Sequence, residues 1–216
     1  MPGDEQQHAF ALPFRLQAYR PLIADGTAAA SSLRPMAHQG LTGVLLVGGA
    51  SRRFGSPKAL AEIKGETLAE RAWRTLGAVC NERVAVGKSV DGLGFPFPVH
   101  DDGTPVRAPL AGVVAGLRRA SHDVCVVLPV DCPLVSPAAL TQLAEACADA
   151  AVSQTGPMPG AYRRTALPQL QQRLVDGDLE LRAALEELET RIVELDPDEL
   201  VNVNTEGDLR RLVARS

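Results

Sequence analysis

Short runs of β-branched and other apolar residues recur along the chain from residue 41 onward, and segments with a helical period separate them. Each run is only four to seven residues long, which is typical of strands rather than of helices. The run at 124–130 is almost continuously apolar, as expected of a central parallel strand with both faces buried. The pattern predicts seven strands, at residues 43–47, 83–87, 97–100, 124–130, 150–154, 191–195 and 200–203.

Helix-start signals lie between these runs. Thr67 is followed three residues later by Glu70, the spacing of a capping box, and Ser136 precedes Pro137 as a cap precedes a first helical turn. The first three predicted helices run from Thr67 to about 79, from Pro109 or Leu110 to 120, and onward from Ser136. Three more follow, over 167–175, over 179–188 with Asp178 as the cap, and from Thr205 to 213, where Asp208 supports the start. This alternation predicts an α/β fold, with a single doubly wound, mostly parallel sheet and helices on both faces.

The first 40 residues differ from the rest of the chain because they contain no sustained period. They include a run of small residues at 26–32 and three of the eight aromatic residues, Phe10, Phe14 and Tyr19. We expect residues 1–40 to be a weakly ordered N-terminal extension or linker and residues 41–216 to form one domain. Packing of the short apolar stretch on a neighbouring surface is the alternative.

Composition narrows the functional classes. The 216 residues are 45% apolar and carry 22 basic against 26 acidic side chains, so the net charge of −4 argues against a surface that wraps nucleic acid. The four cysteines form no C-x-x-C pair, which favours reduced, buried thiols. No apolar run approaches the roughly 18 residues of a membrane span, and Asp4 and Glu5 stand where a signal peptide would be basic. We therefore expect a cytoplasmic protein without a membrane or nucleic-acid partner.

The first predicted strand runs into a glycine pair followed by basic residues. In a doubly wound sheet, ligands bind beyond the carboxyl ends of the strands. Gly48 and Gly49 would let backbone N–H groups approach a ligand there, and Arg53 and Lys58 would add positive charge, which favours a polyphosphate. The spacing matches neither the GxxxxGK[ST] loop nor GxGxxG. A glycine-rich turn with solvated basic side chains is the alternative interpretation.

Carboxylates follow two further predicted strands. Asp131 ends the apolar run 124–130, where a carboxylate is costly unless it is paired or binds a cation, and Mg²⁺ with a triphosphate is a natural partner. Asp101 and Asp102 follow the strand at 97–100 and are either ligand-binding groups or solvated loop residues. Cys132, beside Asp131, is not needed as a nucleophile, because phosphoryl transfer requires positioning and charge neutralisation.

Two later segments carry polar groups in suggestive patterns. Asn202 and Asn204 would point the same way from an extended chain, toward phosphates, a metal's waters or a second substrate. They also fit Asx-type caps for the last helix. The segment 159–167 contains Tyr162, Arg163 and Arg164, which fit either an anion site or a solvated helix start.

The segment LVGGASRRFGSPKAL at 46–60 resembles the nucleotidyltransferase signature L-x-G-G-x-S-x-R-M-G-x-D-K, most closely that of the molybdenum cofactor guanylyltransferases. P-L-A-G at 109–112, D-x-P at 131–133 and V-N-V-N-T at 201–205 extend the resemblance over about residues 41–214. The resemblance implies nucleotide-binding residues Leu46, Val47, Gly48, Gly49, Lys58, Asp102 (or Asp101) and Asp131; catalytic residues Arg53, Lys58 and Asp131; Asp131 as the Mg²⁺ ligand; and acceptor-binding residues Asn202, Asn204 and Arg163.

The reaction that the resemblance implies is transfer of GMP from GTP to the terminal phosphate of molybdenum-molybdopterin, with Mg²⁺ and release of pyrophosphate. Molybdoenzymes or their chaperones are the further partners that it implies. Pro57 stands where the guanylyltransferases usually have Asp, and S-P-K-A-L is more typical of the related cytidylyltransferases. A cytidylyltransferase, or another small-molecule nucleotidyltransferase of this fold, is therefore one alternative. A non-catalytic nucleotide-binding domain is the other, although such a domain has little need of Asp131.

Overall fold

The structure, a computed structural model, describes residues 40–48, 57–92 and 94–215. The predicted extension, apart from Gly40, and the glycine-rich segment at 49–56 lie outside the described residues.

Seven strands of the described chain form one mixed sheet in the order β5-β4-β1-β6-β8-β7-β9. The strands are β1 (Leu41–Leu46), β4 (Glu82–Gly87), β5 (Val99–Asp101), β6 (Val124–Pro129), β7 (Ala150–Ser153), β8 (Gly156–Arg163) and β9 (Thr190–Val193). β8 runs antiparallel to both of its neighbours, and the remaining neighbouring pairs are parallel. A two-stranded hairpin, β2 (Glu62–Ile63) and β3 (Glu66–Thr67), lies outside this sheet. The prediction of a doubly wound, mostly parallel sheet is confirmed.

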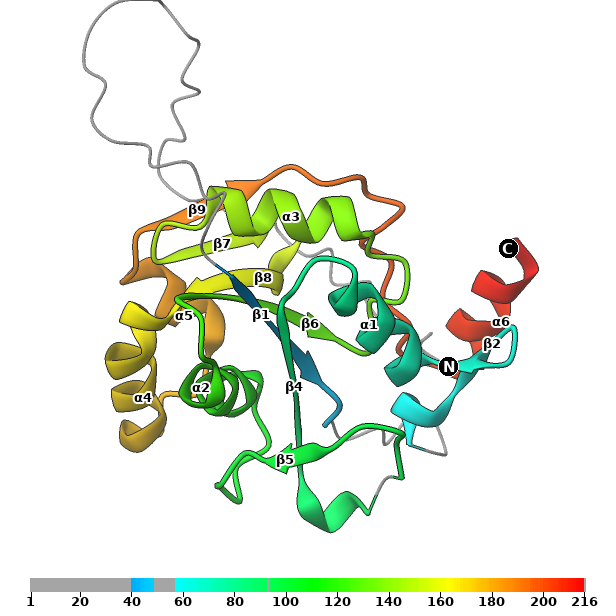
Figure 1. The fold of residues 1–216 in the computed structure, drawn as a ribbon, viewed down its shortest axis with the longest axis horizontal. Helices are drawn as coiled ribbons and strands as arrows, with labels where there is room; N and C mark the ends of the chain where they lie inside the picture. The colour runs from blue at the N-terminus through cyan, green and yellow to red at the C-terminus, as the bar shows by residue number, and fades with distance from the viewer. Residues whose placement is uncertain (1–39, 49–56, 93, 216) are drawn as a thin grey trace, which may run out of the picture. The chain divides into compact units, whose positions relative to one another are not determined.

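Helices cover both faces of the sheet (Figure 1). One face packs against α1 (Leu68–Gly77) and α3 (Pro137–Ala146), and the other against α2 (Pro109–Arg119), α4 (Leu167–Asp176) and α5 (Leu181–Glu186). The last helix, α6 (Glu206–Arg215), packs Leu209 and Leu212 against the core on the α1 side. Short 3-10 turns complete the fold: η1 (Lys58–Leu60), η2 (Ser89–Asp91) and η3 (Arg164–Ala166).

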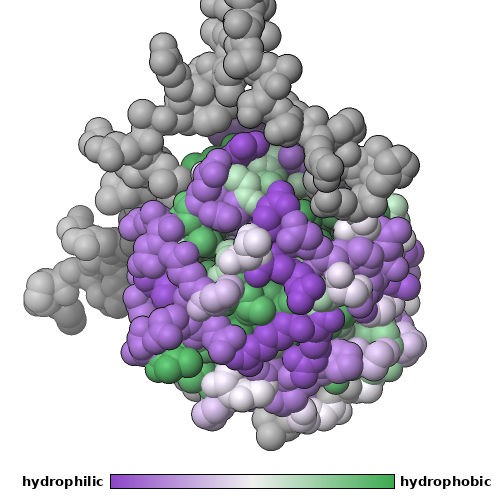
Figure 2. Space-filling model, turned by 60° about the vertical axis from the view of Figure 1, so that its left-hand side comes forward, coloured by the Kyte–Doolittle hydropathy of each residue, from purple (hydrophilic) through white to green (hydrophobic). Residues whose placement is uncertain are grey.

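Hydrophilic residues cover most of the face shown in Figure 2, and apolar residues appear there as small separate patches. Patches of this kind are ordinary on a hydrated protein surface. None of the described helices combines the length and apolar character that a membrane crossing demands.

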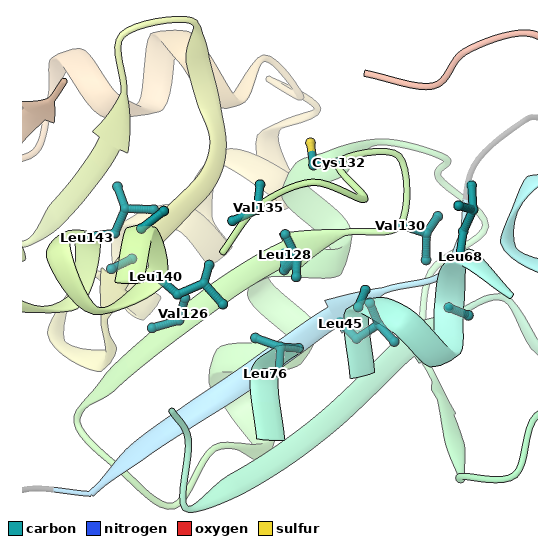
Figure 3. Packing of buried hydrophobic residues seen from close by; sticks show 14 of the residues in the cluster. Leu45, Leu68, Leu76, Val126, Leu128, Val130, Cys132, Val135, Leu140 and Leu143 are labelled. Atoms are coloured by element: carbon teal, nitrogen blue, oxygen red, sulfur yellow. The ribbon is translucent and has the colours of Figure 1, made fainter. Parts of the chain in front are cut away.

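The core lies between the sheet and its helices. Leu45, Val126 and Leu128 project from the central strands toward Leu76 of α1 and Leu140 of α3 (Figure 3). On the opposite face, α2 approaches β1 closely because it presents glycine there: a Cβ on Gly116 would lie 2.4 Å from a Val44 methyl carbon. Truncating a fully buried leucine of such a core costs about 2–5 kcal/mol. The packing therefore fixes the ends of the central strands firmly.

The predicted helix starts are largely confirmed. Thr67 and Glu70 form the capping box of α1, with Glu70 N donating to Thr67 Oγ1 at 3.1 Å and Thr67 N to Glu70 Oε2 at 3.0 Å. Ser136 caps α3, and Thr205 and Asp208 bond reciprocally at the start of α6. The prediction for Asp178 is wrong, because α5 begins at Leu181 and the Asp178 carboxylate pairs with Arg173 instead.

Two strand predictions differ from the structure. Residues 200–203 form no strand: Leu200 ends a turn, where its N–H donates to Pro197 O at 3.2 Å, and the irregular backbone after it is held by a bond from Val203 N to Asp131 O at 2.8 Å. β8 was not predicted, because its sequence GPMPGAYR is rich in proline and glycine. Pairing with β6 and β7 on its two sides makes it a strand despite this composition.

Candidate functional site

The carboxyl ends of β1, β4, β5 and β6 meet at one edge of the sheet, and the strand order reverses between β1 and β6. Crevices form at such reversal points in doubly wound sheets. A pocket of about 310 Å³ lies here, with a lining that includes Leu46, Gly48, Gly87, Lys88, Asp102 and Asp131. Residues that follow four different strands, or the loops after them, thus contribute to one cavity.

Glycines place backbone rather than side chains at the ends of β1 and β4. A Cβ on Gly48 would lie 3.4 Å from the Gly87 Cα, and one on Gly87 would lie 2.8 Å from a methyl carbon of Val47. A side chain at position 87 would therefore collide with Val47, whereas a Cβ at position 48 would make only an ordinary van der Waals contact. Val47 itself is buried, and its N–H donates to Val86 O at 3.0 Å. This tight pairing leaves the pocket wall open to a close-lying ligand.

A cationic side chain meets an anionic side chain of the pocket lining, Asp131. Lys58 Nζ lies 3.3 Å from Asp131 Oδ2 and 3.0 Å from Asn204 Oδ1. The Lys58 and Asp131 side chains are 15% and 31% exposed, so solvent and ligands reach the pair. Sequence analysis predicted all three residues, which come from η1, the end of β6 and the segment before α6. The fold brings them together.

Asp131 is held from the side by the segment at 202–204. Its backbone oxygen accepts from Val203 N, and Cys132 Sγ donates to Asn202 Oδ1 at 3.0 Å. Burial raises the pKa of the Cys132 thiol well above its usual range, so this side chain stays a neutral donor and not a thiolate nucleophile. Asn202 and Asn204 therefore both reach the residues around Asp131, as their alternation predicted.

The two neighbouring aspartates have different environments. Asp101 accepts from the backbone N–H groups of Ser89 and Gly103, each at 2.7 Å, and these bonds lower its pKa to about 2. Asp102 lies in the pocket wall with its side chain only 8% exposed, and Lys88 Nζ donates to its Oδ1 at 2.6 Å. Asp101 is thus occupied by its own loop, whereas Asp102 faces the cavity.

Arg163, a predicted acceptor-binding residue, lies away from the pocket. Arg163 pairs in register with Val124 at the amino end of β6, and its guanidinium contacts Asp123 and donates to the carbonyl oxygen of Ala148 at 2.8 Å. The antiparallel direction of β8 carries it to the edge opposite Asp131, so the structure does not bring it to the pocket. Gly49 and Arg53 lie outside the described residues.

The described side chains at the pocket are suited to holding Mg²⁺ together with a substrate, but not on their own. Among the described residues, no group of three acidic, histidine or cysteine side chains could form an all-protein metal cage. Mg²⁺ is usually held by one or two carboxylates together with substrate phosphates and water. A partly exposed Asp131 beside the pocket fits that arrangement.

Comparison with known proteins agrees with this geometry. The sequence model of the family described as "MobA-like NTP transferase domain" matches residues 43–192. The chain belongs to this family.

Relatives of this MobA-like chain carry specific names. It is 31% identical to "Probable molybdenum cofactor guanylyltransferase" of Aquifex aeolicus, over 79% of this chain and 89% of the relative. It is 29% identical to "Molybdenum cofactor guanylyltransferase" of Desulfosudis oleivorans, over 81% and 95%. The crystal structure of molybdopterin-guanine dinucleotide biosynthesis protein A from Archaeoglobus fulgidus is similar, with a TM-score of 0.70, 25% identity and coverage of 81% and 97%. The resemblance that the motifs indicated is confirmed.

Among the residues that line the MobA-like pocket and that sequence reasoning missed is a charged one, Lys88. It directly follows β4, and its side chain is 9% exposed in the pocket lining. The rule that chemistry follows the strand ends would have selected it, since Gly48 and Asp131 were selected on that ground. Lys88 was overlooked because no motif surrounds it.

Proposed function

We propose that the protein transfers GMP from GTP to the terminal phosphate of molybdenum-molybdopterin and releases pyrophosphate. The observation that carries this proposal is the meeting of Lys58, Asp131 and Asn204 at the mouth of a pocket in a MobA-like transferase domain. The names of the relatives supply the nucleotide and the acceptor. Nucleotidyl transfer needs charge stabilisation and positioning, which this cluster provides.

The pocket divides into an end for the base and an end for the phosphates. Leu46, Gly48 and Asp102 lie in its lining and form the proposed nucleoside end. The ionised Asp102 carboxylate is an acceptor only, which suits the N1–H and 2-amino donors of guanine. Lys58 and Asp131 form the phosphate end. By resemblance, Gly49 and Arg53 complete it, although they lie outside the described residues.

In the proposed reaction, an oxygen of the acceptor's terminal phosphate attacks the α-phosphorus of GTP. A new P–O bond forms, the bond between the α-phosphorus and the bridging oxygen breaks, and pyrophosphate leaves with that electron pair. The acceptor phosphate is already largely anionic near pH 7, so no protein base is required. Lys58 would stabilise charge on the leaving pyrophosphate, where a charge-assisted hydrogen bond is worth about 1.5–3 kcal/mol.

Asp131 would hold Mg²⁺ against the nucleotide phosphates. When bound, Mg²⁺ supplies charge neutralisation at those oxygens. Asn204 orients the Lys58 ammonium, to which its side-chain oxygen is bonded. Asn202 and Asn204 are the proposed acceptor-side groups, and Arg163 is not among them because it lies at the opposite edge of the sheet.

Domain limits, location and downstream partners belong to the same proposal. Residues 41–216 would form the transferase domain and residues 1–40 an extension, which the family match at 43–192 supports. The protein would work in the cytoplasm and deliver its product to molybdoenzymes or their chaperones.

The test is pyrophosphate release from purified protein with molybdenum-molybdopterin and Mg²⁺, run in parallel with GTP and with CTP. We expect release with GTP that depends on both the acceptor and Mg²⁺. Failure to release pyrophosphate with any nucleoside triphosphate would overturn transferase function and leave a non-catalytic binding domain.

CTP is the second candidate donor because Pro57 departs from the guanylyltransferase signature. Faster release with CTP than with GTP would assign the chain to the cytidine-using branch. The same assay therefore separates both alternatives from the main proposal.

A further inference from the structure

The Lys88 side chain, which is only 9% exposed, has no part in the reaction proposed above. Its Nζ donates to Asp102 Oδ1 at 2.6 Å, to the Val106 carbonyl oxygen at 2.6 Å, and to the carbonyl oxygen of Thr104. An ammonium group has three N–H donors. All three of these donors are engaged by the protein itself, so Lys88 has no donor left for a nucleotide.

The Asp102 carboxylate, which pairs with Lys88, is hydrogen-bonded through only one of its two oxygens within the described residues. Asp102 Oδ1 accepts from Lys88 and also from the backbone N–H of Thr104 at 3.1 Å. Within the described part of the chain, no hydrogen bond engages Asp102 Oδ2. The carboxylate belongs to the pocket lining, and an ionised carboxylate oxygen has room for further donors. Lys88 thus fixes the group through one oxygen and leaves the other available.

Lys88 also organises the loop that forms this wall. Residues 102–108 contain neither helix nor strand, and they lead directly into α2. Lys88 draws the carbonyl groups of Thr104 and Val106 to one point, while Val106 N donates to Thr104 Oγ1 at 3.2 Å. Beyond the loop, Ala108 and Gly112 continue the pocket wall. The lysine therefore determines where the Asp102 carboxylate and the wall stand relative to β1.

Charge gives Lys88 a second role at this place. An unpaired Asp102 carboxylate would repel a triphosphate bound in the same pocket, and its desolvation would be unfavourable because the Asp102 side chain is only 8% exposed. Pairing with Lys88 offsets the charge while the acceptor oxygen remains. Asp102 can thus accept hydrogen bonds from the base, while the Lys88–Asp102 pair as a whole carries no net negative charge.

We propose that Lys88 is a positioning and specificity-determining residue, which orients Asp102 to accept from the N–H donors of the nucleobase without touching the nucleotide. The identity of the base, guanine, rests on the proposed function. The mechanism predicts that loss of Lys88 harms recognition of the base and spares recognition of the phosphates. Lys58 has the opposite role, since it lies at the phosphate end.

The experiment compares Lys88→Met with wild type and with Lys64→Met, which removes the same charge from an exposed turn between β2 and β3. Kinetics are measured with GTP and with inosine triphosphate, which lacks only the 2-amino donor. Binding of GTP and of inorganic tripolyphosphate is measured with Mg²⁺ by displacement of a fluorescent nucleotide.

We expect wild type and Lys64→Met to prefer GTP over inosine triphosphate by about tenfold or more in kcat/KM, the value of one hydrogen bond to a charged acceptor. Lys88→Met should lose most of this preference, with a rise in the KM for GTP that exceeds the fall in kcat. Its affinity for tripolyphosphate should stay within about twofold of wild type. Lys88→Arg keeps the charge and should recover part of the preference.

An unchanged preference for GTP in Lys88→Met would overturn the inference and leave Lys88 a purely structural residue. Equal loss of GTP and tripolyphosphate binding would overturn it as well, because it would place Lys88 with the phosphates. If Lys88→Met does not fold, Lys88→Gln is subjected to the same comparison. If wild type binds GTP but transfers nothing, the proposed function fails, whereas the binding measurements still decide the role of Lys88.

Discussion

Two lysine–aspartate pairs contribute to the pocket, one through Asp131 and the other through Lys88 and Asp102, and they are built differently. Lys58 and Asp131 are 3.3 Å apart, with side chains 15% and 31% exposed. Lys88 and Asp102 are 2.6 Å apart, with side chains 9% and 8% exposed. Lys58 and Asp131, here named the open pair, are exposed enough for the lysine to bind phosphates and the aspartate a metal ion in place of each other. Lys88 and Asp102, here named the closed pair, form part of the pocket wall, and every donor of the lysine is bonded within the protein. In the two proposals above, the same two residue types serve binding in one place and positioning in the other.

The energetic expectations differ accordingly. Partly exposed ion pairs contribute about 0–1 kcal/mol to stability, so the open pair can be altered without loss of the fold. Removal of one partner from a buried pair costs about 3–5 kcal/mol, because an uncompensated charge stays behind. Substitutions should therefore separate the two pairs by their effects on activity and on unfolding.

The largest effect should come from Asp131→Asn. We expect pyrophosphate release to fall by about 10²–10³-fold or more, because a charge that stabilises the transition state is lost with the metal ligand. The free energy of unfolding should change by no more than about 1 kcal/mol. Steady-state kinetics at several Mg²⁺ concentrations and denaturant unfolding measure the two quantities. Near-normal, Mg²⁺-dependent turnover in this variant would remove Asp131 from the metal site.

The closed pair should respond in stability as well as in specificity. Lys88→Met should lower the free energy of unfolding by about 3 kcal/mol, since the Asp102 side chain, only 8% exposed, loses its ion-pair partner. The double variant Lys88→Met, Asp102→Asn should be more stable than Lys88→Met alone, because it removes both charges. Urea unfolding of the two variants provides the measurement. A double variant less stable than the single one would contradict the closed character of this pair.

Lys58→Ala should weaken nucleotide binding and turnover together. We expect each to fall by about 10-fold to 100-fold, the range for one charge-assisted hydrogen bond. Tripolyphosphate affinity should fall in parallel, in contrast with the expectation for Lys88→Met. Titration calorimetry with GTP and with tripolyphosphate distinguishes the two lysines. If Lys58→Ala loses base selection instead, the assignment of the two ends must be reversed.

Asn204→Ala should have a smaller effect on the open pair. The amide accepts from Lys58 Nζ at 3.0 Å, and removal of this bond should reduce kcat/KM by about threefold to tenfold. Asn81→Ala is the matched control, because Asn81 bonds to Leu41 N at the amino end of β1. Comparable losses in both variants would show that Asn204 acts only through general stability.

Asp101→Asn should have the smallest effect on activity and a distinct effect on acid stability. The pKa of Asp101 is lowered to about 2 by backbone hydrogen bonds, so its contribution is fully present above about pH 4 and is lost as the pH falls toward 2. The variant should lose that part of the pH dependence between pH 4 and 2 while it retains activity at pH 7. Loss of nucleotide binding comparable with that of Asp102→Asn would contradict the separate roles of the two aspartates.

The sequence predicted the open pair better than the closed one. Lys58 and Asp131 stand in motifs that follow recognisable strands, and the order of those strands ensures that they meet. Lys88 acquires its role from the carbonyl groups of Thr104 and Val106, whose convergence depends on a loop without regular structure. Such a convergence leaves no periodic signal in the chain.

The two errors in the predicted strands, the run at 200–203 and the omission of β8, have a related cause. The run at 200–203 has the composition of a strand, yet no neighbouring strand pairs with it: Leu200 N donates within a turn, to Pro197 O, and Val203 N donates to Asp131 O. β8 has an unfavourable composition but is paired on both sides. Strand formation depends on partners far away in the sequence, and local propensity does not report them. The placement of Arg163 followed from this error, because only the direction of β8 shows which edge of the sheet it reaches.

The bond between Lys58 and Asn204 joins positions 146 residues apart. Together with the bond from Val203 to Asp131, it makes the proposed reaction centre depend on a segment outside the sheet that lies next to the last helix. Segments of this kind, with few backbone bonds, open at a lower free energy than core strands do. Heating should therefore inactivate the protein by detachment of this segment while the sheet is still folded, so thermal inactivation would report the local opening of one segment rather than global unfolding.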